Sequence, residues 1–364
     1  MIHPETLTRR YEHQRTALQN PSYDHFKAEM ERNGVLIFDP APALMDAKSH
    51  SDRPQYLMTD THWRPEAMAL AAEELKKFIQ KHVPLDATPD PGYRMEASEL
   101  VQLGDLAVML DLPANQRIYP REKISLWKVL EKEGREPWKA QQAADVLVLG
   151  DSFSNIYSLE AMGWGEAAGF VEQLSYRLKR PLDRITRNDN GSYATREFLA
   201  GEMARGRDRL AGKRLVIYQF AIRELAVGDW KRIDLKLGAS PETKYLALPP
   251  GGEWIVRGRI EAVSAVPRPG TVPYKDHVMA IHMTDLQRDG RPLAETDAVV
   301  YMKSMTDHLW TPAARYRSGE TVEIRLRAWS DVADRYEGIN RSELDDATHQ
   351  FAEPCWGEAV QPSS

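Results

Sequence analysis

The stretch Val146-Leu147-Val148-Leu149-Gly150-Asp151-Ser152-Phe153-Ser154 decides the fold of this chain. Its first four residues are two valines and two leucines, and such a run predicts a strand buried on both faces of a parallel sheet. The strand ends at Gly150, so Ser152 would lie on the turn that leads into the next helix, near the helix N-terminus. A serine in that place is a candidate nucleophile, and a helix cap is the alternative interpretation.

Helix and strand patterns alternate after this stretch. We expect a helix, a strand, a second helix and a second strand at residues 166–179, 182–186, 193–211 and 215–218. Strands separated by helices predict a parallel sheet with helices on its faces, so the fold class is α/β. Ligands bind such sheets at the carboxyl ends of the strands, and Ser152 follows one of those ends.

The region before this sheet contains one well-marked helix. It begins at Pro65, a residue suited to the first helical position. Apolar residues then recur at helical spacing and predict one buried face, formed by Met68, Ala71, Ala72, Leu75, Phe78 and Ile79. A short apolar run at residues 35–38 predicts a strand, whereas residues 83–140 show no clear pattern.

The pattern changes after Trp230. Residues 238–252 contain three prolines and three glycines and are interpreted as a linker. Beyond it, strands are predicted at residues 254–263, 277–286, 298–305 and 321–328, with a hairpin turn at Asp289-Gly290. We therefore predict a catalytic domain at 1–237, a linker at 238–252, a smaller antiparallel β domain at 253–345, OB-like in topology, and a poorly ordered tail at 346–364.

Composition narrows the possible classes of protein. The 364 residues carry a net charge of −6, which gives no general attraction to nucleic acid or to anionic membranes. No apolar stretch approaches the length of a membrane span, and the polar first twenty residues predict no signal peptide. The single cysteine, Cys355, excludes an internal disulfide and a cysteine-based metal cluster, and we interpret it as an incidental thiol.

A serine nucleophile needs a base, and the base needs a third group that fixes its tautomer. Among ten histidines, His62 is the best candidate, because Asp60 lies two residues before it and the helix at Pro65 follows directly. We interpret His277, His282 and His308 as structural or surface residues. A metal site at Asp60 and His62 would lack a third well-spaced ligand. We therefore predict neither a metal nor any other cofactor.

Taken together, Asp60-Thr61-His62-Trp63 and the later Gly150-Asp151-Ser152-Phe153-Ser154 resemble the alginate O-acetyltransferase family of the AlgX/AlgJ type, over residues 25–235. In ordinary SGNH hydrolases the serine motif comes first, and the reversed order is particular to this family. The resemblance implies an SGNH-hydrolase-like (flavodoxin-like) domain with a Ser152-His62-Asp60 triad.

The resemblance also assigns further residues. Asn190-Gly191 matches the second SGNH block, in which the glycine N–H helps to form the oxyanion hole, and Arg223 matches a family segment after the third strand. No asparagine-containing third block follows residues 215–218. Trp63, Tyr157 and Trp164 are candidates for stacking on sugar rings, with a place in the core as the alternative.

The function implied is transfer of acetyl groups onto exopolysaccharide hydroxyls in the bacterial periplasm. The expected partners are a polysaccharide acceptor and an acetyl donor, supplied by a membrane-bound O-acyltransferase, with no role for nucleic acid. Two alternatives stay open: an SGNH esterase that removes acyl groups, and a non-catalytic polysaccharide-binding or assembly protein. Ser152 Oγ is expected within hydrogen-bond reach of His62. The β domain is interpreted as separable, with glycan binding and a structural or docking role as its two candidate functions.

Overall fold

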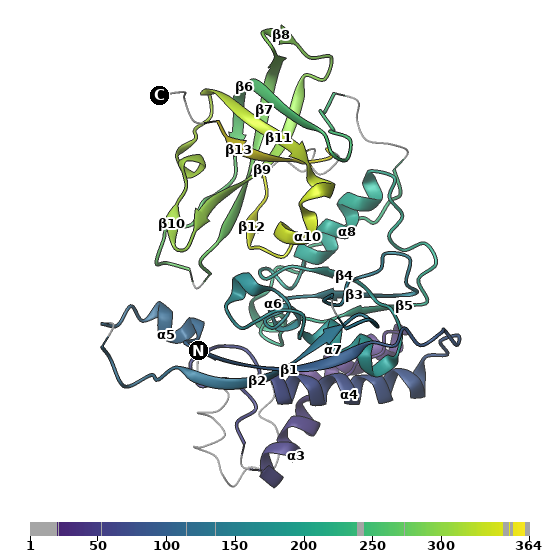
Figure 1. Cartoon of the computed structure of the whole chain (residues 1–364). Helices are drawn as coiled ribbons and strands as arrows, with labels where there is room; N and C mark the ends of the chain where they lie inside the picture. Colours follow the sequence, from purple (N-terminus) through teal and green to yellow (C-terminus); the bar gives the residue numbers. More distant parts are fainter. Residues whose placement is uncertain are drawn as a thin grey trace. The chain divides into compact units, whose positions relative to one another are not determined.

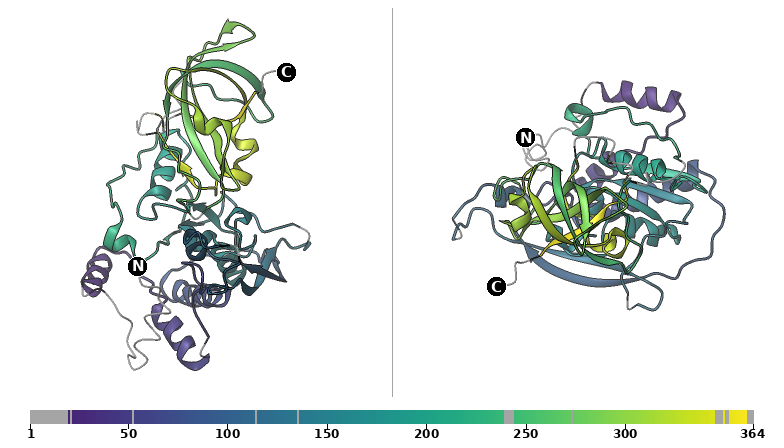
Figure 2. Two further views of the ribbon diagram at one scale, coloured as in Figure 1. Left: turned by 90° about the vertical axis from the view of Figure 1, so that its left-hand side faces the viewer. Right: turned by 90° about the horizontal axis from the view of Figure 1, so that it is seen from above.

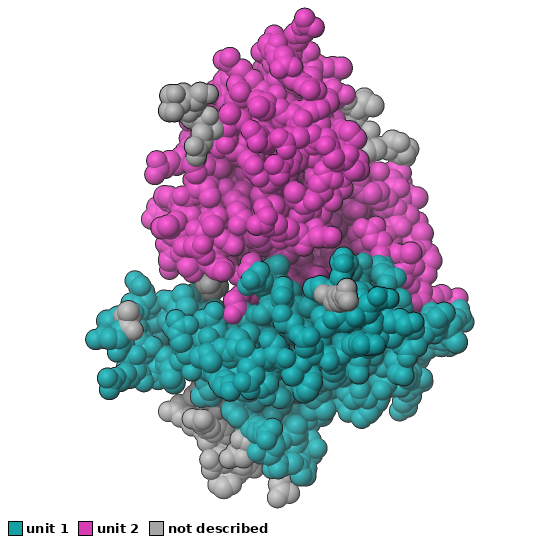
Figure 3. All heavy atoms as spheres, in the orientation of Figure 1, with its two compact units in different colours: residues 1–141, 156–160, 164–182 teal, residues 142–155, 161–163, 183–364 magenta. Residues whose placement is uncertain are grey.

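The computed structural model describes residues 20, 22–51, 53–113, 115–134, 136–238, 244–272, 274–344, 349 and 352–360. The chain divides into two compact units (Figure 3). Unit 1 comprises residues 1–141, 156–160 and 164–182, and unit 2 comprises residues 142–155, 161–163 and 183–364.

Unit 1 is built from helices and one β hairpin. Its elements are α2 (Tyr23–Arg32), α3 (Ala41–Ser51), α4 (Pro65–His82), β1 (Arg94–Gln102), α5 (Asp105–Met109), β2 (Glu122–Leu130) and α7 (Phe170–Leu178). The predicted helix at Pro65 is confirmed as α4, whose buried face includes Met68, Ala71, Ala72, Leu75 and Ile79. This face packs against α7, and β1 pairs with β2 antiparallel along its full length (Figure 1).

Unit 2 begins with the predicted parallel sheet. Its strands are β3 (Val146–Gly150), β4 (Asp183–Thr186) and β5 (Leu215–Tyr218), with β3 in the centre. Every residue of β3 is buried, as its apolar run predicted. The helices are α6 (Ser152–Asn155), α8 (Ala194–Ala204) and α9 (Glu224–Val227), and α8 packs Leu199 and Met203 against the sheet.

The second part of unit 2 is a β-barrel-like sheet (Figure 2). Its main strands are β6 (Glu253–Val263), β7 (His277–Arg288), β9 (Asp297–Thr306), β11 (Thr321–Ala328) and β13 (Cys355–Ala359). Pairings β6–β7, β7–β9, β9–β13, β13–β11 and β11–β6 close these five strands into a ring. The shorter elements are β8 (Arg291–Pro292), β10 (Leu309–Trp310), α10 (Ala333–Tyr336) and β12 (Arg341–Ser342). The predicted Asp289-Gly290 turn joins β7 to β8, with positive φ at both residues.

Three local predictions were wrong. Residues 35–38 form no strand. No strand of the described residues pairs with them, and Val35 and Leu36 are exposed. The proline- and glycine-based linker prediction fails at Leu246 and Leu248, which are buried in the core of the barrel-like sheet. Part of the predicted tail is β13, which pairs with β11 and β9.

Cys355 begins β13 and is fully buried in this core, where burial raises the pKa of its thiol to about 12. Cys355 is therefore part of the core, which the interpretation as an incidental thiol did not anticipate. No helix among the residues placed in the structure combines the length and the apolar character that a membrane crossing requires.

His277 lies at the start of β7, and its environment leads us to expect a measurable pH dependence of the free energy of unfolding. Its ring is buried, with Nδ1 2.7 Å from Ser304 Oγ, and burial lowers its pKa to about 4. The unfolded chain takes up a proton near pH 6.5, which the folded chain does not, so the free energy of unfolding falls as pH drops from about 6.5 toward 4. The expected contribution is about 3 kcal/mol.

The measurement is urea unfolding at several pH values for the parent and for His277→Gln. The difference in unfolding free energy between the two proteins should be constant above pH 7. It should shift by about 3 kcal/mol in favour of the variant on the way to pH 4. A difference that stays constant over the whole range would show that His277 is protonated equally in both states.

Candidate active site

The D-x-H motif lies in unit 1, on the turn just before α4. His62 Nδ1 lies 2.6 Å from Asp60 Oδ1, and the His62 backbone N–H donates to the same oxygen at 3.1 Å. Both side chains are buried. Because a carboxylate only accepts, Nδ1 carries the proton and Nε2 is left as the basic nitrogen. The predicted contact between Asp60 and the imidazole is confirmed.

The second oxygen of Asp60 is held from two other parts of unit 1. Oδ2 accepts the indole N–H of Trp164 at 2.8 Å and the backbone N–H of Asp105 at 3.0 Å. Burial by itself would raise the pKa of Asp60, but these hydrogen bonds and the interaction with His62 outweigh it and lower the pKa. Asp60 is therefore an ionised, fixed acceptor, which is what a triad base requires.

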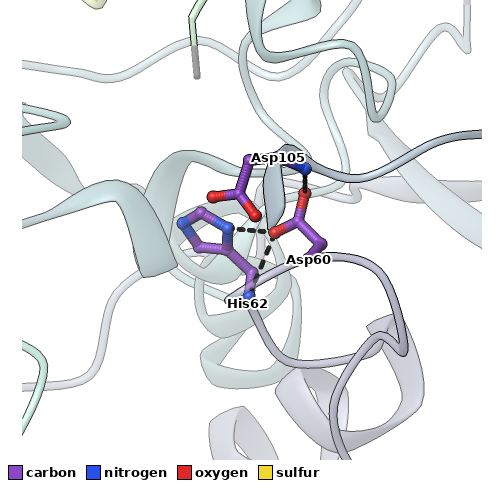
Figure 4. A group of neighbouring side chains, drawn as sticks. All are labelled: Asp60, His62 and Asp105. Carbon is purple, nitrogen blue, oxygen red and sulfur yellow. Dashed lines mark hydrogen bonds and ion pairs between the residues drawn. The ribbon is translucent and has the colours of Figure 1, made fainter. Parts of the chain in front are cut away.

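Asp105 is a second acidic residue at this place, and sequence reasoning missed it. Figure 4 shows its carboxylate beside His62 and Asp60, and ligand atoms of the three residues lie within 4.8 Å of one another. The premise that Asp60 and His62 lack a third nearby ligand was therefore wrong. The Asp105 oxygens accept the Thr61 N–H and hydroxyl, each at 2.9 Å. These bonds account for its position.

The serine motif lies in unit 2, where Ser152 is the first residue of α6, directly past the end of β3. The carboxylate of Asp151 is buried and accepts the N–H groups of Phe153 (2.9 Å) and Ala221 (2.7 Å). Burial raises the pKa of Asp151. Gln219 also binds this motif: its Nε2 donates to Asp151 Oδ1 at 2.8 Å and its Oε1 accepts the Ser154 hydroxyl at 2.6 Å.

Gln219 is a second residue that sequence reasoning missed. It directly follows β5, at the strand end where the asparagine of a third SGNH block was sought. Its position at the carboxyl end of a predicted parallel strand is the feature of the sequence that could have indicated Gln219.

The Asn190-Gly191 turn follows β4 and approaches the serine motif within unit 2. A Cβ on Gly191 would lie 3.1 Å from Asp151 Oδ2, so glycine allows this close approach. The Gly191 carbonyl accepts the hydroxyl of Tyr218 at 2.6 Å, which fixes the turn. The structure therefore brings the predicted second block against the first. Arg223 also lies near, with its guanidinium 5.8 Å from the Phe153 ring centre.

The three aromatic candidates for sugar stacking are core residues of unit 1. Tyr157 is fully buried and donates its hydroxyl to the Trp63 carbonyl at 2.6 Å. Trp63 is buried and its ring packs against Phe170. Trp164 is also buried, and its indole N–H donates to Asp60 Oδ2. The prediction that these rings stack on a glycan is therefore wrong, and the alternative, that they are core residues, is confirmed.

The candidate residues thus form two groups. Unit 1 holds Asp60 and His62, and unit 2 holds Ser152, Asn190, Gly191 and Arg223. Pairing of Ser152 with His62 would join the two units and stays a prediction.

Comparison with known proteins decides the family. Residues 1–221 match the family model of the SGNH hydrolase-like domain of the acetyltransferase AlgX. The chain belongs to this family. The membership expected from the two motifs is confirmed, and with it the SGNH-hydrolase-like fold of the parallel-sheet region.

Curated relatives include two proteins described as probable alginate O-acetylase AlgJ. The one from Pseudomonas syringae pv. tomato is 27% identical over 131 residues, which is 36% of this chain and 32% of the relative. The one from Pseudomonas fluorescens is 26% identical over 136 residues, 36% of this chain and 34% of the relative. The matches thus span about a third of the length of these relatives.

Two solved structures are also similar. The O-acetyltransferase domain of Pseudomonas putida AlgJ is 19% identical with a TM-score of 0.46, covering 61% of this chain and 74% of that chain. Pseudomonas aeruginosa AlgX is 12% identical with a TM-score of 0.42, covering 88% of this chain and 74% of that chain.

Proposed function

We propose that the protein is a polysaccharide O-acetyltransferase that uses Ser152, His62 and Asp60 as a triad. The observation that carries the proposal is the buried Asp60–His62 pair, in which an ionised carboxylate holds Nδ1 and leaves Nε2 as a base. Membership of an acetyltransferase family and the place of Ser152 past the end of β3 support it. The activity named for the AlgJ relatives is the one proposed here.

The chemistry would run in two steps. His62 Nε2 takes the proton from Ser152 Oγ as Oγ attacks the acetyl carbonyl of the donor, and the leaving group departs with that proton. The backbone N–H groups of Ser152 and Gly191 hold the oxyanion, and Asp60 stabilises the imidazolium. In the second step a glycan hydroxyl gives its proton to His62 Nε2 and its oxygen attacks the acetyl carbonyl of acetyl-serine. The ester bond to Ser152 then breaks, the acetyl group stays on the glycan oxygen, and His62 returns the proton to Ser152 Oγ.

The β domain is proposed as OB-like and as the part that holds the glycan. The ring order β6-β7-β9-β13-β11, with a single parallel pair between β9 and β13, supports the OB-like topology. A cavity of about 480 Å³ in unit 2 is lined partly by β7 and β9, through Ala280, Val299 and Tyr301, and also by Asn190. Its wall carries both cations and carboxylates, which suits a polyhydroxylated ligand.

The proposed setting follows the family. The acceptor is an exopolysaccharide, the compartment is the periplasm, and the acetyl donor is supplied by a membrane-bound O-acyltransferase. An esterase differs only in accepting water in place of a glycan hydroxyl, and it is the second candidate. A groove that holds the acceptor beside the acetyl-serine is what would favour transfer over hydrolysis.

The test is to incubate the protein with p-nitrophenyl acetate and a uronic acid oligosaccharide, and to follow the oligosaccharide by mass spectrometry. A transferase adds acetyl groups to the sugar, and Ser152→Ala adds none. An esterase releases nitrophenol and acetate without acetylated sugar. If the protein binds the oligosaccharide but does not turn over the ester, its function is non-catalytic polysaccharide binding.

A further inference from the structure

Trp164 occupies an unusual position for a core tryptophan. It is 1% exposed, and its indole N–H donates to Asp60 Oδ2 at 2.8 Å, across 104 residues of sequence. A buried indole N–H needs an acceptor, and a backbone carbonyl or a hydroxyl could supply one. Here the acceptor is the carboxylate that holds His62.

The backbone around Trp164 fixes where the indole points. Gly163 and Gly165 flank it, with φ values of 82° and 99°. Both values lie in the left-handed region, which glycine adopts without the steric cost that other residues bear. A Cβ on Gly165 would also lie 2.6 Å from Leu126 Cδ1. Glycine on both sides of the tryptophan therefore lets the Gly-Trp-Gly segment take this path without backbone strain.

The two oxygens of Asp60 have separate partners. Oδ1 binds His62, and Oδ2 binds the Trp164 indole and the Asp105 backbone N–H. The two donors to Oδ2 prevent rotation of the carboxylate about its Cβ–Cγ bond. Without the indole, one anchor is lost, and a water molecule or a rotated carboxylate would compete for the bond to Nδ1.

We propose that Trp164 is a positioning residue that holds the Asp60 carboxylate in the orientation in which it binds His62 Nδ1. The catalytic part of this inference rests on the proposed function. Among the described residues, the groups with ionisable side chains that interact with Asp60 include His62, Asp105 and Tyr157. Trp164 differs from all three because its N–H stays a donor at every pH at which the protein is folded.

The test compares Trp164→Phe with a matched control, Trp138→Phe. Trp138 is also a buried tryptophan of unit 1, and its indole N–H donates to Ser175 Oγ at 2.9 Å, away from the D-x-H motif. Each change removes one indole N–H and leaves a smaller ring in the core. Both should lower thermal stability to a similar extent, so a general packing effect appears in both variants.

Two readouts separate positioning from packing. Trp164→Phe should lower kcat for an acetyl ester by roughly 10- to 100-fold with KM changed less than about twofold, whereas Trp138→Phe should keep the parental kcat. The downfield proton NMR signal of the His62 Nδ1–H bonded to Asp60 should shift or broaden only in the Trp164 variant. This second readout needs no turnover, so it tests Trp164 even if the proposed activity is absent.

The inference is overturned if Trp164→Phe keeps both the parental kcat and the parental Nδ1–H signal. It is equally overturned if the two variants change both readouts alike. Should Trp164→Phe not fold, 3-benzothienylalanine at position 164 keeps the shape of the side chain and replaces only the N–H by sulfur. The same two readouts then apply to that variant.

Discussion

Replacing Ser152 or His62 by alanine is expected to lower turnover of a small acetyl ester by roughly three orders of magnitude or more. Ser152→Ala removes the nucleophile, and His62→Ala removes the base that activates it. Because the residues of a triad act together, the double variant should be little slower than either single variant. The measurement is the initial rate of p-nitrophenyl acetate hydrolysis for the two single variants and the double variant.

Controls for this experiment come from the surface of unit 1. Ser49→Ala and His82→Ala remove the same side chains from exposed positions on α3 and at the end of α4, and should retain the parental rate. A parental rate in Ser152→Ala would place the nucleophile elsewhere. Urea unfolding of each variant separates a lost catalytic group from a lost fold.

Asp60 requires a different substitution from the other two residues. Alanine would leave the buried indole N–H of Trp164 and the part-buried backbone N–H of Asp105 without their acceptor, which costs stability as well as activity. Asp60→Asn keeps the shape and one acceptor oxygen but cannot stabilise the imidazolium or hold its tautomer. We therefore expect Asp60→Asn to lose activity by orders of magnitude with a smaller loss of stability.

Deletion of residues 240–364 is expected to abolish both ester turnover and glycan transfer. The sequence alone suggested a separable domain, but unit 2 includes the parallel sheet together with the barrel-like sheet. In the loop after β4, the Asn188 amide donates to the Gly338 carbonyl at 2.6 Å, and Arg187 lies 3.3 Å from Glu343. Without these partners, the loop that leads to Gly191 loses its supports.

The experiment compares ester turnover and glycan transfer between the shortened and the full-length protein. Circular dichroism follows whether the shortened protein is folded. Arg327→Gln, which removes an exposed ion pair with Glu253 in the same domain, is the control and should keep both activities. Survival of ester turnover alone in the shortened protein would restore the separable-domain interpretation.

Local sequence determined the parts of the fold that depend on spacing and composition. The apolar run of β3 and the helical periodicity of α4 require a buried strand and a helix with one buried face, whatever else surrounds them. The two-residue spacing of Asp60 and His62 lets the carboxylate reach the imidazole within one turn. The order of the two motifs was enough to indicate the family.

Tertiary structure alone decided which distant residues complete these local features. Asp105, Trp164 and Gln219 lie 45, 104 and 68 residues from the groups they bind, and no periodicity connects such positions. The same holds for β13, a five-residue segment that is a strand because β11 and β9 offer it open edges. Hydrogen bonds across the chain depend on how strands and loops come together, and a local pattern carries no information about that.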